Sequence, residues 1–315
     1  MPTITEFINT FWVGSIYFLS AVGLTISYRV TRVLNFAHIN LMTIGAYTAV
    51  LLSLSSPVHV AFAIPVVFLV GGIFMMAVHF AVYSRLMELK ATPLVLMISS
   101  MGVWIFVKFF LYGLLGYLQK AWKVEMYLAK PRLIVGGEIK VEGLTLSGDL
   151  FTALALATLA AIFLYVFFSR TKTGKALRAV ADNPDLAEIS GISHSRVMYI
   201  TWFIAGGLAS LSGMMWALFA HATPELGDTL ILQLFAASVI GGLYSVPLTT
   251  VGAYTIAAAE NIVIATLHET IGLEVSYRPF FAFFILLVVI LVRPPLGAGG
   301  GLPYRFKVLR RLMRR

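Results

Sequence analysis

Apolar residues along this chain are gathered into long blocks, and polar residues are gathered into shorter segments between them. Such blocks recur from the N-terminal region as far as residue 292. A helix needs roughly 20 mainly apolar residues to cross about 30 Å of hydrocarbon, so we predict nine membrane-spanning helices. They cover residues 9–28, 33–54, 60–83, 92–115, 149–168, 197–220, 229–245, 249–267 and 276–292.

Two of the predicted helices contain polar or helix-breaking interruptions. The second opens with the run Asn35-Phe36-Ala37-His38, and the seventh is broken by Gly241-Gly242 ahead of Pro247. Because of these interruptions, eight complete spans with re-entrant pieces are an alternative to nine. Both counts predict the same fold class, an all-α polytopic transmembrane helical bundle that forms a single domain over residues 1–315.

The composition agrees with a membrane protein and excludes several kinds of chemistry. Hydrophobic residues make up 59% of the chain and charged residues only 12%, whereas soluble domains have about 25% charged residues. A water-soluble fold could not bury this much apolar surface. The chain contains no cysteine, which excludes disulfides, thiolate metal sites and cysteine nucleophiles.

The distribution of charge along the chain sets the predicted orientation. Most of the 23 lysines and arginines fall in segments that share one side of the membrane if the N-terminus is outside. Cytoplasmic loops are enriched in these residues. We therefore place the loop 169–196 and the C-terminal tail 293–315 in the cytoplasm, and the acidic loops 221–228 and 268–275 outside.

The net charge of +9 also has a membrane explanation. We expect the basic tail 293–315 to lie against anionic lipid, at about 1 kcal/mol per cation, and not to bind nucleic acid. On the other side of the membrane, the segment 117–148 is the main predicted extracytoplasmic excursion. Its alternating Val and Ile residues around Gly136-Gly137 predict a small hairpin.

The cytoplasmic loop has the pattern of two short helices. Residues 174–182 predict a cationic helix, and Asn183-Pro184 ends it and begins another, because Asn caps a helix and Pro suits its first position. Asp185 and Glu188 follow in early turns, where the helix dipole favours acids. Gly191 predicts a left-handed ending. From spacing alone, a solvated connector between two spans is the preferred explanation of this loop.

A group of polar residues is predicted near the inner end of the second span. Asn35, His38 and Asn40 lie close together there, and unpaired polar groups in hydrocarbon are costly. They either line a water-filled path or form an interhelical hydrogen-bond set that fixes packing. A metal site at His38 is not expected, because no second histidine or carboxylate stands at ligand spacing.

Two ionisable residues are predicted well inside spans. They are Lys108 in the fourth span and Glu260 in the eighth, and intramembrane ionisable groups are candidates for function. We hypothesise that they pair with each other. The alternatives are that either side chain snorkels to the interface or faces a hydrated cavity for structural reasons.

Catalysis and cofactor binding are not indicated by the residue pattern. The carboxylates of the cytoplasmic loop lie on a solvated helix with no apolar pocket around them. The run Thr173-Gly174-Lys175 lacks the Ser or Thr that a phosphate-binding loop carries after its lysine. We therefore expect no catalytic residues, no metal and no cofactor in this chain.

Four stretches of sequence resemble a known family when they are taken together. They are "RVLNFAHINLMTIGAYTA" at 32–49, "GKALRAVADNPDLAEISGI" at 174–192, "SVIGGLYSVP" at 238–247 and "VRPPLGAGG" at 292–300. In their residues and in their order they resemble motifs of the permease subunits of branched-chain amino acid ABC transporters, the first of the two Liv-type permeases in particular. The four motifs cover nearly the whole chain.

This resemblance implies roles for two sets of residues. The first set is expected to couple the chain to an ATPase and comprises Gly174, Arg178, Ala179, Asp182, Asn183, Pro184, Asp185, Glu188 and Gly191. The second is expected along the translocation path and comprises Asn35, Phe36, His38, Asn40, Gly241, Gly242, Ser245 and Glu260. The family commonly has glycine at the positions of Ile39, Tyr244 and Leu248. These departures bear on which cargo is transported and not on the fold.

The resemblance also implies partners and a location. The chain is expected to be a non-catalytic, multi-pass subunit of a prokaryotic cytoplasmic membrane, with ATPase subunits, a second permease in a homodimer or heterodimer, and an extracytoplasmic substrate-binding protein. Hydrophobic amino acids are the implied cargo, with urea or short amides as the nearest alternative. A secondary transporter or channel is the competing class, and it would need ion-coupling charges or a polar lining within the spans.

Overall fold

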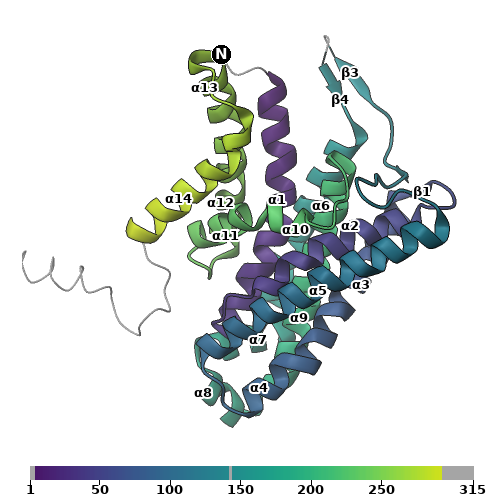
Figure 1. The fold of residues 1–315 in the computed structure, drawn as a ribbon. Coiled ribbons are helices and arrows are strands. Elements are labelled where there is room, and N and C mark those ends of the chain that lie inside the picture. The colour runs from purple at the N-terminus through teal and green to yellow at the C-terminus, as the bar shows by residue number, and fades with distance from the viewer. Residues whose placement is uncertain (1–3, 142–143, 293–315) are drawn as a thin grey trace, which may run out of the picture.

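The computed structural model describes residues 4–141 and 144–292, which are almost entirely helical (Figure 1). The basic tail predicted at 293–315 lies outside these residues. The α-helices are α1 (Ile4–Thr31), α2 (Asn40–Leu52), α3 (Val60–Val78), α4 (Ser84–Glu88), α5 (Pro93–Trp122), α6 (Gly148–Arg170), α7 (Lys172–Asp182), α8 (Pro184–Ile189), α9 (His194–Phe219), α10 (Leu226–Thr229), α11 (Ile231–Ile240), α12 (Val246–Ala258), α13 (Ile264–Ile271) and α14 (Arg278–Val292).

Short helical segments of other types join or precede several of these helices. The 3-10 helix η1 (Phe36–Ile39) leads into α2, and η4 (Val275–Tyr277) leads into α14. The π-helical segments η2 (His79–Tyr83) and η3 (Ala259–Val263) connect α3 to α4 and α12 to α13. α3 with α4, and α12 with α13, therefore each form one continuous helix that contains a short π-helical segment.

Within the residues that the structure describes, six helices are long and apolar enough to cross a membrane. They are Ile4–Thr31, Val60–Glu88, Pro93–Trp122, Gly148–Arg170, His194–Phe219 and Val246–Ile271. The second, seventh and ninth predicted spans correspond to shorter apolar helices, at Phe36–Leu52, Ile231–Ile240 and Arg278–Val292. The second and seventh predicted spans, which the sequence marks as interrupted, are thus among the three shorter helices, and the ninth is the third. The polar run before α2 shortens the second predicted span, and the glycines after α11 shorten the seventh.

The centre of the bundle is formed by α1 and α9, which are the most enclosed of the long helices. α1 packs against α9, α12 and α11, while α9 also packs against α2 and α3. Small residues allow the close contact: a Cβ atom placed on Gly213 of α9 would lie 1.8 Å from the Met42 carbonyl oxygen of α2. Small residues at contacts are how helix backbones approach closely in membranes.

β2, β3 and β4 lie in the segment between α5 and α6, and β1 lies between α2 and α3. β3 (Ile139–Val141) pairs antiparallel with β4 (Leu144–Leu146), and β1 (Val58–His59) pairs in parallel with β2 (Leu133–Ile134). The predicted hairpin is therefore present, but its strands follow Gly136-Gly137 and do not flank it.

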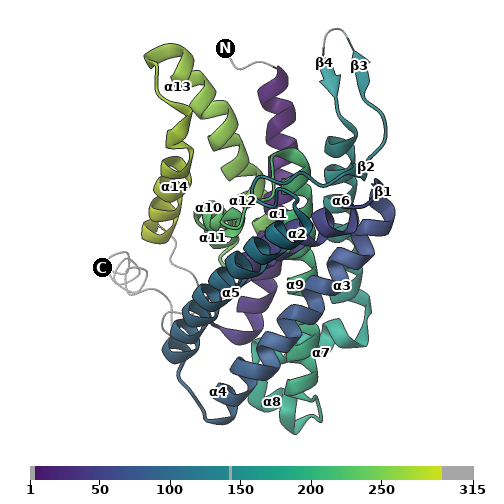
Figure 2. The ribbon, with the colours of Figure 1, turned by 45° about the vertical axis from the view of Figure 1, so that its right-hand side comes forward.

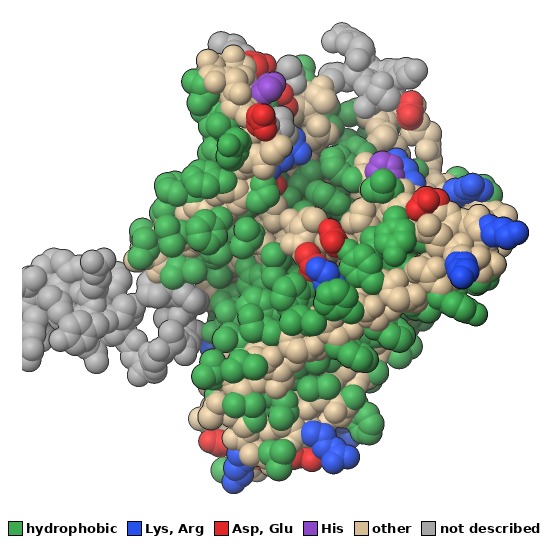
Figure 3. Space-filling model, viewed as in Figure 1, with side chains coloured by type: hydrophobic (Ala, Val, Ile, Leu, Met, Phe, Trp, Pro, Cys, Tyr) green, Lys and Arg blue, Asp and Glu red, His purple; other side chains and the backbone are tan. Residues whose placement is uncertain are grey.

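The molecule has two distinct ends. In Figures 1 and 2, α4, α7 and α8 lie together at one end, whereas β3, β4, α13 and the beginning of α1 lie at the other. Charged side chains gather mainly toward the ends, and the surface between them is largely hydrophobic (Figure 3). This distribution is the one expected of a protein that crosses a membrane between these two ends.

Candidate functional site

The loop between α6 and α9 folds into the two helices that its sequence predicts. Thr171 caps α7, because its hydroxyl accepts a 2.9 Å hydrogen bond from the Gly174 amide. Asn183 ends α7 and caps α8, accepting a 3.0 Å bond from the Leu186 amide. Gly191 follows α8 with φ +81°. The predictions of a helix break at Asn183-Pro184 and of a left-handed glycine are confirmed.

α7 is seated firmly on the rest of the bundle. Leu177, Val180 and Ala181 are buried, and a Cβ atom on Gly174 would lie 2.0 Å from the Phe167 carbonyl oxygen. No side chain larger than hydrogen fits there without moving backbone. Arg178 and Ala179 are half-buried on the same helix.

α8 is the more exposed of the two helices. Only Ala187 is buried, and two apolar side chains one turn apart face outward, with Leu186 60% exposed and Ile189 85% exposed. The sequence-predicted residues Asn183, Pro184, Asp185, Glu188 and Gly191 are exposed around them. The sequence motif singled out the polar members of this surface and missed Leu186 and Ile189, although their spacing of three places them on one helix face.

One predicted coupling residue, Asp182, has a contact within the chain. The Tyr244 hydroxyl donates a 2.8 Å hydrogen bond to the Asp182 Oδ1 atom. The guanidinium carbons of Arg29 and Arg32 lie 4.6 and 5.0 Å from the centre of the Tyr244 ring, within the range of cation–π attraction. We call these four residues the Tyr244 clasp.

The Tyr244 clasp joins three parts of the fold. Arg29 and Arg32 come from the end of α1 and the residue after it, Asp182 from the end of α7, and Tyr244 from the turn between α11 and α12. Arg32 also donates a 2.8 Å hydrogen bond to the Ala181 carbonyl oxygen. Arg32 and Leu243 both have φ 57°, a conformation uncommon outside glycine. Strained backbone of this kind persists only where surrounding contacts hold it.

The turn after α11 contains the predicted residues Gly241, Gly242 and Ser245. A Cβ atom on Gly241 would lie 2.2 Å from the Thr249 hydroxyl oxygen, and Gly242 has φ +66°. Ser245 caps α12, with a 3.4 Å bond from the Leu248 amide to its hydroxyl. The break predicted at Gly241-Gly242 is therefore confirmed, and it reverses the chain sharply at this point.

The interior polar residues make hydrogen bonds to several elements. Asn35 accepts from the Ala37 amide at 3.0 Å and from the Tyr83 hydroxyl at 2.9 Å. His38 Nε2 lies 3.0 Å from the Ser20 carbonyl oxygen, and Asn40 donates to the Trp104 carbonyl oxygen at 2.9 Å. All three sequence-predicted side chains are buried. The interhelical hydrogen-bond set is thus present, and a role in lining a path stays a prediction.

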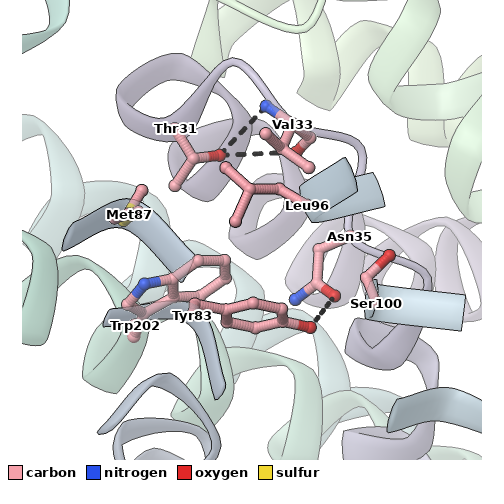
Figure 4. A pocket seen from close by; sticks show the side chains of 8 residues that line it. All are labelled: Thr31, Val33, Asn35, Tyr83, Met87, Leu96, Ser100 and Trp202. Atoms are coloured by element: carbon pink, nitrogen blue, oxygen red, sulfur yellow. Dashed lines mark hydrogen bonds between the residues drawn. The ribbon is translucent and has the colours of Figure 1, made fainter. Parts of the chain in front are cut away.

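A small cavity lies beside Asn35 (Figure 4). Its volume is about 10 Å³, which is room for about one water molecule. Its lining residues are Thr31, Val33, Asn35, Tyr83, Met87, Leu96, Ser100 and Trp202. Next to it, the Phe36 amide donates to the Ser100 hydroxyl at 3.1 Å, and the Phe36 ring lies 5.2 Å from that of Phe235. The cavity is too small to hold an amino acid.

The hypothesis that Lys108 pairs with Glu260 is wrong. The Lys108 ammonium lies 2.6 Å from the Asp228 carboxylate, and Glu260 accepts a 2.7 Å hydrogen bond from the Tyr17 hydroxyl of α1. Asp228 lies in α10 and Glu260 in η3. Two separate helix contacts therefore account for the two ionisable groups.

Within 4–141 and 144–292, no three histidine, aspartate or glutamate side chains come together in a group that could hold a metal ion. The polar groups of this part of the chain are arranged for helix contacts and for an exposed surface at one end.

Comparison with known proteins agrees with this architecture. Residues 7–292 match the family model described as the permease component of branched-chain amino acid transport systems. The chain is 28% identical to the probable branched-chain amino acid transport permease protein LivH of Methanocaldococcus jannaschii, over 88% of this chain and 86% of that protein. No solved structure matches.

Bacterial relatives show a similar degree of likeness. The chain is 26% identical to the high-affinity branched-chain amino acid transport system permease protein BraD of Pseudomonas aeruginosa, over 92% of this chain and 93% of the relative. It is 24% identical to the LivH permease of Escherichia coli over the same shares. The chain therefore belongs to the family of permease components of branched-chain amino acid transport systems, and it is a non-catalytic, multi-pass membrane subunit.

Proposed function

We propose that this chain forms, together with a second permease subunit, the membrane path of an ATP-driven importer of branched-chain amino acids. The family description and the names of the relatives support branched-chain amino acids as the substrate class. Urea or short amides are the nearest alternative cargo. Since ABC importers take their energy from separate ATPase subunits, the chain needs a surface on which such a subunit acts.

The observation that carries this proposal is the exposed surface of α8. Leu186 and Ile189 are apolar yet largely exposed at the end of the molecule, where no hydrocarbon would cover them in our orientation. Asp185 and Glu188 lie beside them. A small apolar patch with a polar rim is typical of a protein contact, and we assign this one to the ATPase.

The orientation follows from the same assignment. We place α4, α7 and α8 in the cytoplasm, with the N-terminus and the segment around β3 and β4 outside. This agrees with the excess of lysine and arginine around α7 and α8. The outer loops would then meet an extracytoplasmic binding protein that delivers the substrate.

The fold suggests how movement of α8 would reach the membrane path. α8 is short and is fixed to α7 through Asn183, and α7 is held against α6 by the close contact at Gly174. The Tyr244 clasp connects the end of α7 to α1 and to the turn before α12. A push on α8 is thereby transmitted by packed helices as a rigid-body shift.

The function is tested by uptake in proteoliposomes that contain this chain, its second permease, the ATPase subunits and the binding protein. The proposal predicts leucine uptake that requires ATP and is blocked by vanadate. Uptake driven by an ion gradient with no ATPase present would instead support a secondary transporter. Uptake of urea or acetamide but not leucine would replace the cargo and keep the mechanism.

The docking surface is tested separately by Asp185→Arg. This variant is expected to insert into the membrane normally but to lose co-purification with the ATPase, because it places a cation in the acidic rim. Ser195→Ala, an exposed change at the same end but outside α7 and α8, serves as the control. Unchanged co-purification of Asp185→Arg would remove α8 from the ATPase contact.

A further inference from the structure

A charged cluster lies near the middle of α5, where the proposed function has assigned no role. The Lys108 ammonium is 2.6 Å from Asp228 Oδ2, and the Trp104 indole N–H donates to Asp228 Oδ1 at 2.6 Å. One turn further on, the Tyr112 hydroxyl donates to the Glu225 carboxylate. Two carboxylates from the α10 region therefore contact α5: Asp228 meets Lys108 and Trp104, and Glu225 meets Tyr112.

The position of this cluster is unusual for charged groups. α5 is one of the long apolar helices that qualify as membrane spans, and Lys108 lies near its middle. Charges at that depth are rare in membrane helices and mark substrate pathways. α10 and α11 are short, successive pieces in place of one long helix, and transporters build substrate sites at such discontinuous helices.

The ion pair is partly exposed. The side chains of Lys108 and Asp228 are 24% and 20% exposed, and the Asp228 Oδ2 atom that pairs with the lysine is itself covered, so a ligand reaches that oxygen by separating the pair. Figure 3 shows a small group of acidic and basic side chains on the middle of an otherwise hydrophobic face, over α5 and α10.

Given the proposed function, on which this step rests, we infer that Lys108 and Asp228 bind the charged end of a zwitterionic α-amino acid during its passage. The amino acid carries an ammonium and a carboxylate on one carbon. It can therefore insert between Lys108 and Asp228, giving its carboxylate to the lysine and its ammonium to the aspartate. Every charge keeps an opposite partner, which avoids the large cost of an unpaired charge at low dielectric.

The surroundings of the pair fit an apolar substrate side chain. Ile105 lies one turn before Lys108 on the same face of α5 and is 48% exposed. Trp104 adds an aromatic surface beside Asp228. The Trp104 carbonyl oxygen also accepts from Asn40, so the cluster is joined to the polar residues at the start of α2. The ligand class is thus an α-amino acid with a hydrophobic side chain.

The inference is tested by saturation-transfer NMR with the full-length chain in lipid nanodiscs and L-leucine as the probe. Leucine is expected to bind, whereas 4-methylpentanoate, which lacks the ammonium, and 3-methylbutylamine, which lacks the carboxylate, are expected to bind at least tenfold more weakly. Lys108→Met and Asp228→Asn should each weaken leucine binding at least tenfold. Lys120→Met removes a lysine from the exposed end of the same helix and should leave binding unchanged.

Exchanging the two charges separates recognition of the amino acid from a purely structural role of the ion pair between α5 and α10. The double variant Lys108→Asp with Asp228→Lys keeps an ion pair between α5 and α10 but inverts its direction relative to Ile105. We expect wild-type thermal stability and a loss of leucine binding of at least tenfold. Wild-type leucine binding by the exchanged pair would overturn the inference, as would failure of leucine to bind to the unaltered chain.

Uptake by the complete transporter distinguishes failure of this binding site from failure of the proposed function. ATP-dependent leucine uptake that is unaffected by the double variant would leave the importer intact and remove the site. Loss of all ATP-dependent uptake by the unaltered transporter would contradict the proposed function itself.

Discussion

The Tyr244 hydroxyl lies 2.8 Å from Asp182 Oδ1, across 62 residues of sequence. This hydrogen bond ties the turn that follows α11 to the last residue of α7. Because Arg29 and Arg32 lie against the same tyrosine ring, the end of α1 belongs to the same contact. The cytoplasmic loop is therefore joined to the centre of the bundle through side chains as well as through the covalent chain.

Removing the Tyr244 hydroxyl should weaken coupling without preventing assembly. Tyr244→Phe keeps the ring for Arg29 and Arg32 but loses a hydrogen bond worth about 1 kcal/mol, which corresponds to about a fivefold change in an equilibrium. We expect ATP-driven uptake to fall by up to that factor, while co-purification with the ATPase stays at the wild-type level. Tyr117→Phe, at an exposed position on α5, is the control. Full uptake by Tyr244→Phe would show that the hydrogen bond between Tyr244 and Asp182 is not used in coupling.

The junction between α6 and α7 should tolerate no side chain at Gly174. A methyl group there would lie 2.0 Å from the Phe167 carbonyl oxygen, so Gly174→Ala must displace α7. We expect loss of most uptake and reduced binding of the ATPase, with the protein still in the membrane. Gly102→Ala on α5, where a Cβ atom meets nothing within 4 Å, should behave as wild type. Equal uptake by the two variants would contradict this reading of α7.

The contact between α2 and α9 should control the stability of the bundle. Gly213→Ala forces a methyl group into the Met42 backbone, and overpacking of this kind costs about 1–3 kcal/mol. The Tm of the solubilised protein should fall by several degrees. The matched change Gly113→Ala, which meets nothing within 4 Å, should not lower Tm, because alanine is the better helix former. If both variants melt at the same temperature, the close packing of these helices is not needed.

Glu260 is expected to act through its bond with Tyr17. Glu260→Gln keeps an acceptor for the Tyr17 hydroxyl, whereas Glu260→Leu leaves that buried hydroxyl without its acceptor, at about 1–3 kcal/mol. Thermal unfolding should therefore show Glu260→Leu to be clearly less stable than Glu260→Gln. The opposite order would mean that the carboxylate charge matters more than the hydrogen bond.

Local features of this fold could be predicted from the sequence because local rules produce them. Asn183 caps α8 and Gly191 adopts a positive φ, and both follow from preferences that act within a few residues. The break after α11 at Gly241-Gly242 has the same origin. The family was also evident from the order of its motifs, and the match over residues 7–292 confirms it.

Contacts between distant helices could not be predicted in the same way. α1 and α5 are both long and apolar, and the less apolar α1 is largely buried whereas the more apolar α5 is largely exposed. This difference does not say which helices touch each other. The sequence suggests Glu260 as the partner of Lys108 because Glu260 is the only acid predicted well inside a span. Its partner Asp228 lies in α10, a helix of 4 residues, which is too short to produce a periodic pattern.

The proposed roles of the coupling residues and path residues stay predictions. The structure places Asp185, Glu188 and the two apolar residues of α8 on one exposed surface, and it encloses Asn35, His38 and Asn40 between helices. The first arrangement suits a contact with another protein. The second suits helix packing at least as well as a path.

The central claim, that α8 lies in the cytoplasm and receives the ATPase, is tested most directly by labelling Ile189→Cys with a membrane-impermeant maleimide. The chain has no cysteine of its own, and Ile189 is 85% exposed, so the label reports on this position alone. The account predicts labelling in inside-out vesicles, none in intact cells, and protection when the ATPase subunits are bound. Labelling from outside the cell, or labelling that the ATPase does not reduce, would contradict it.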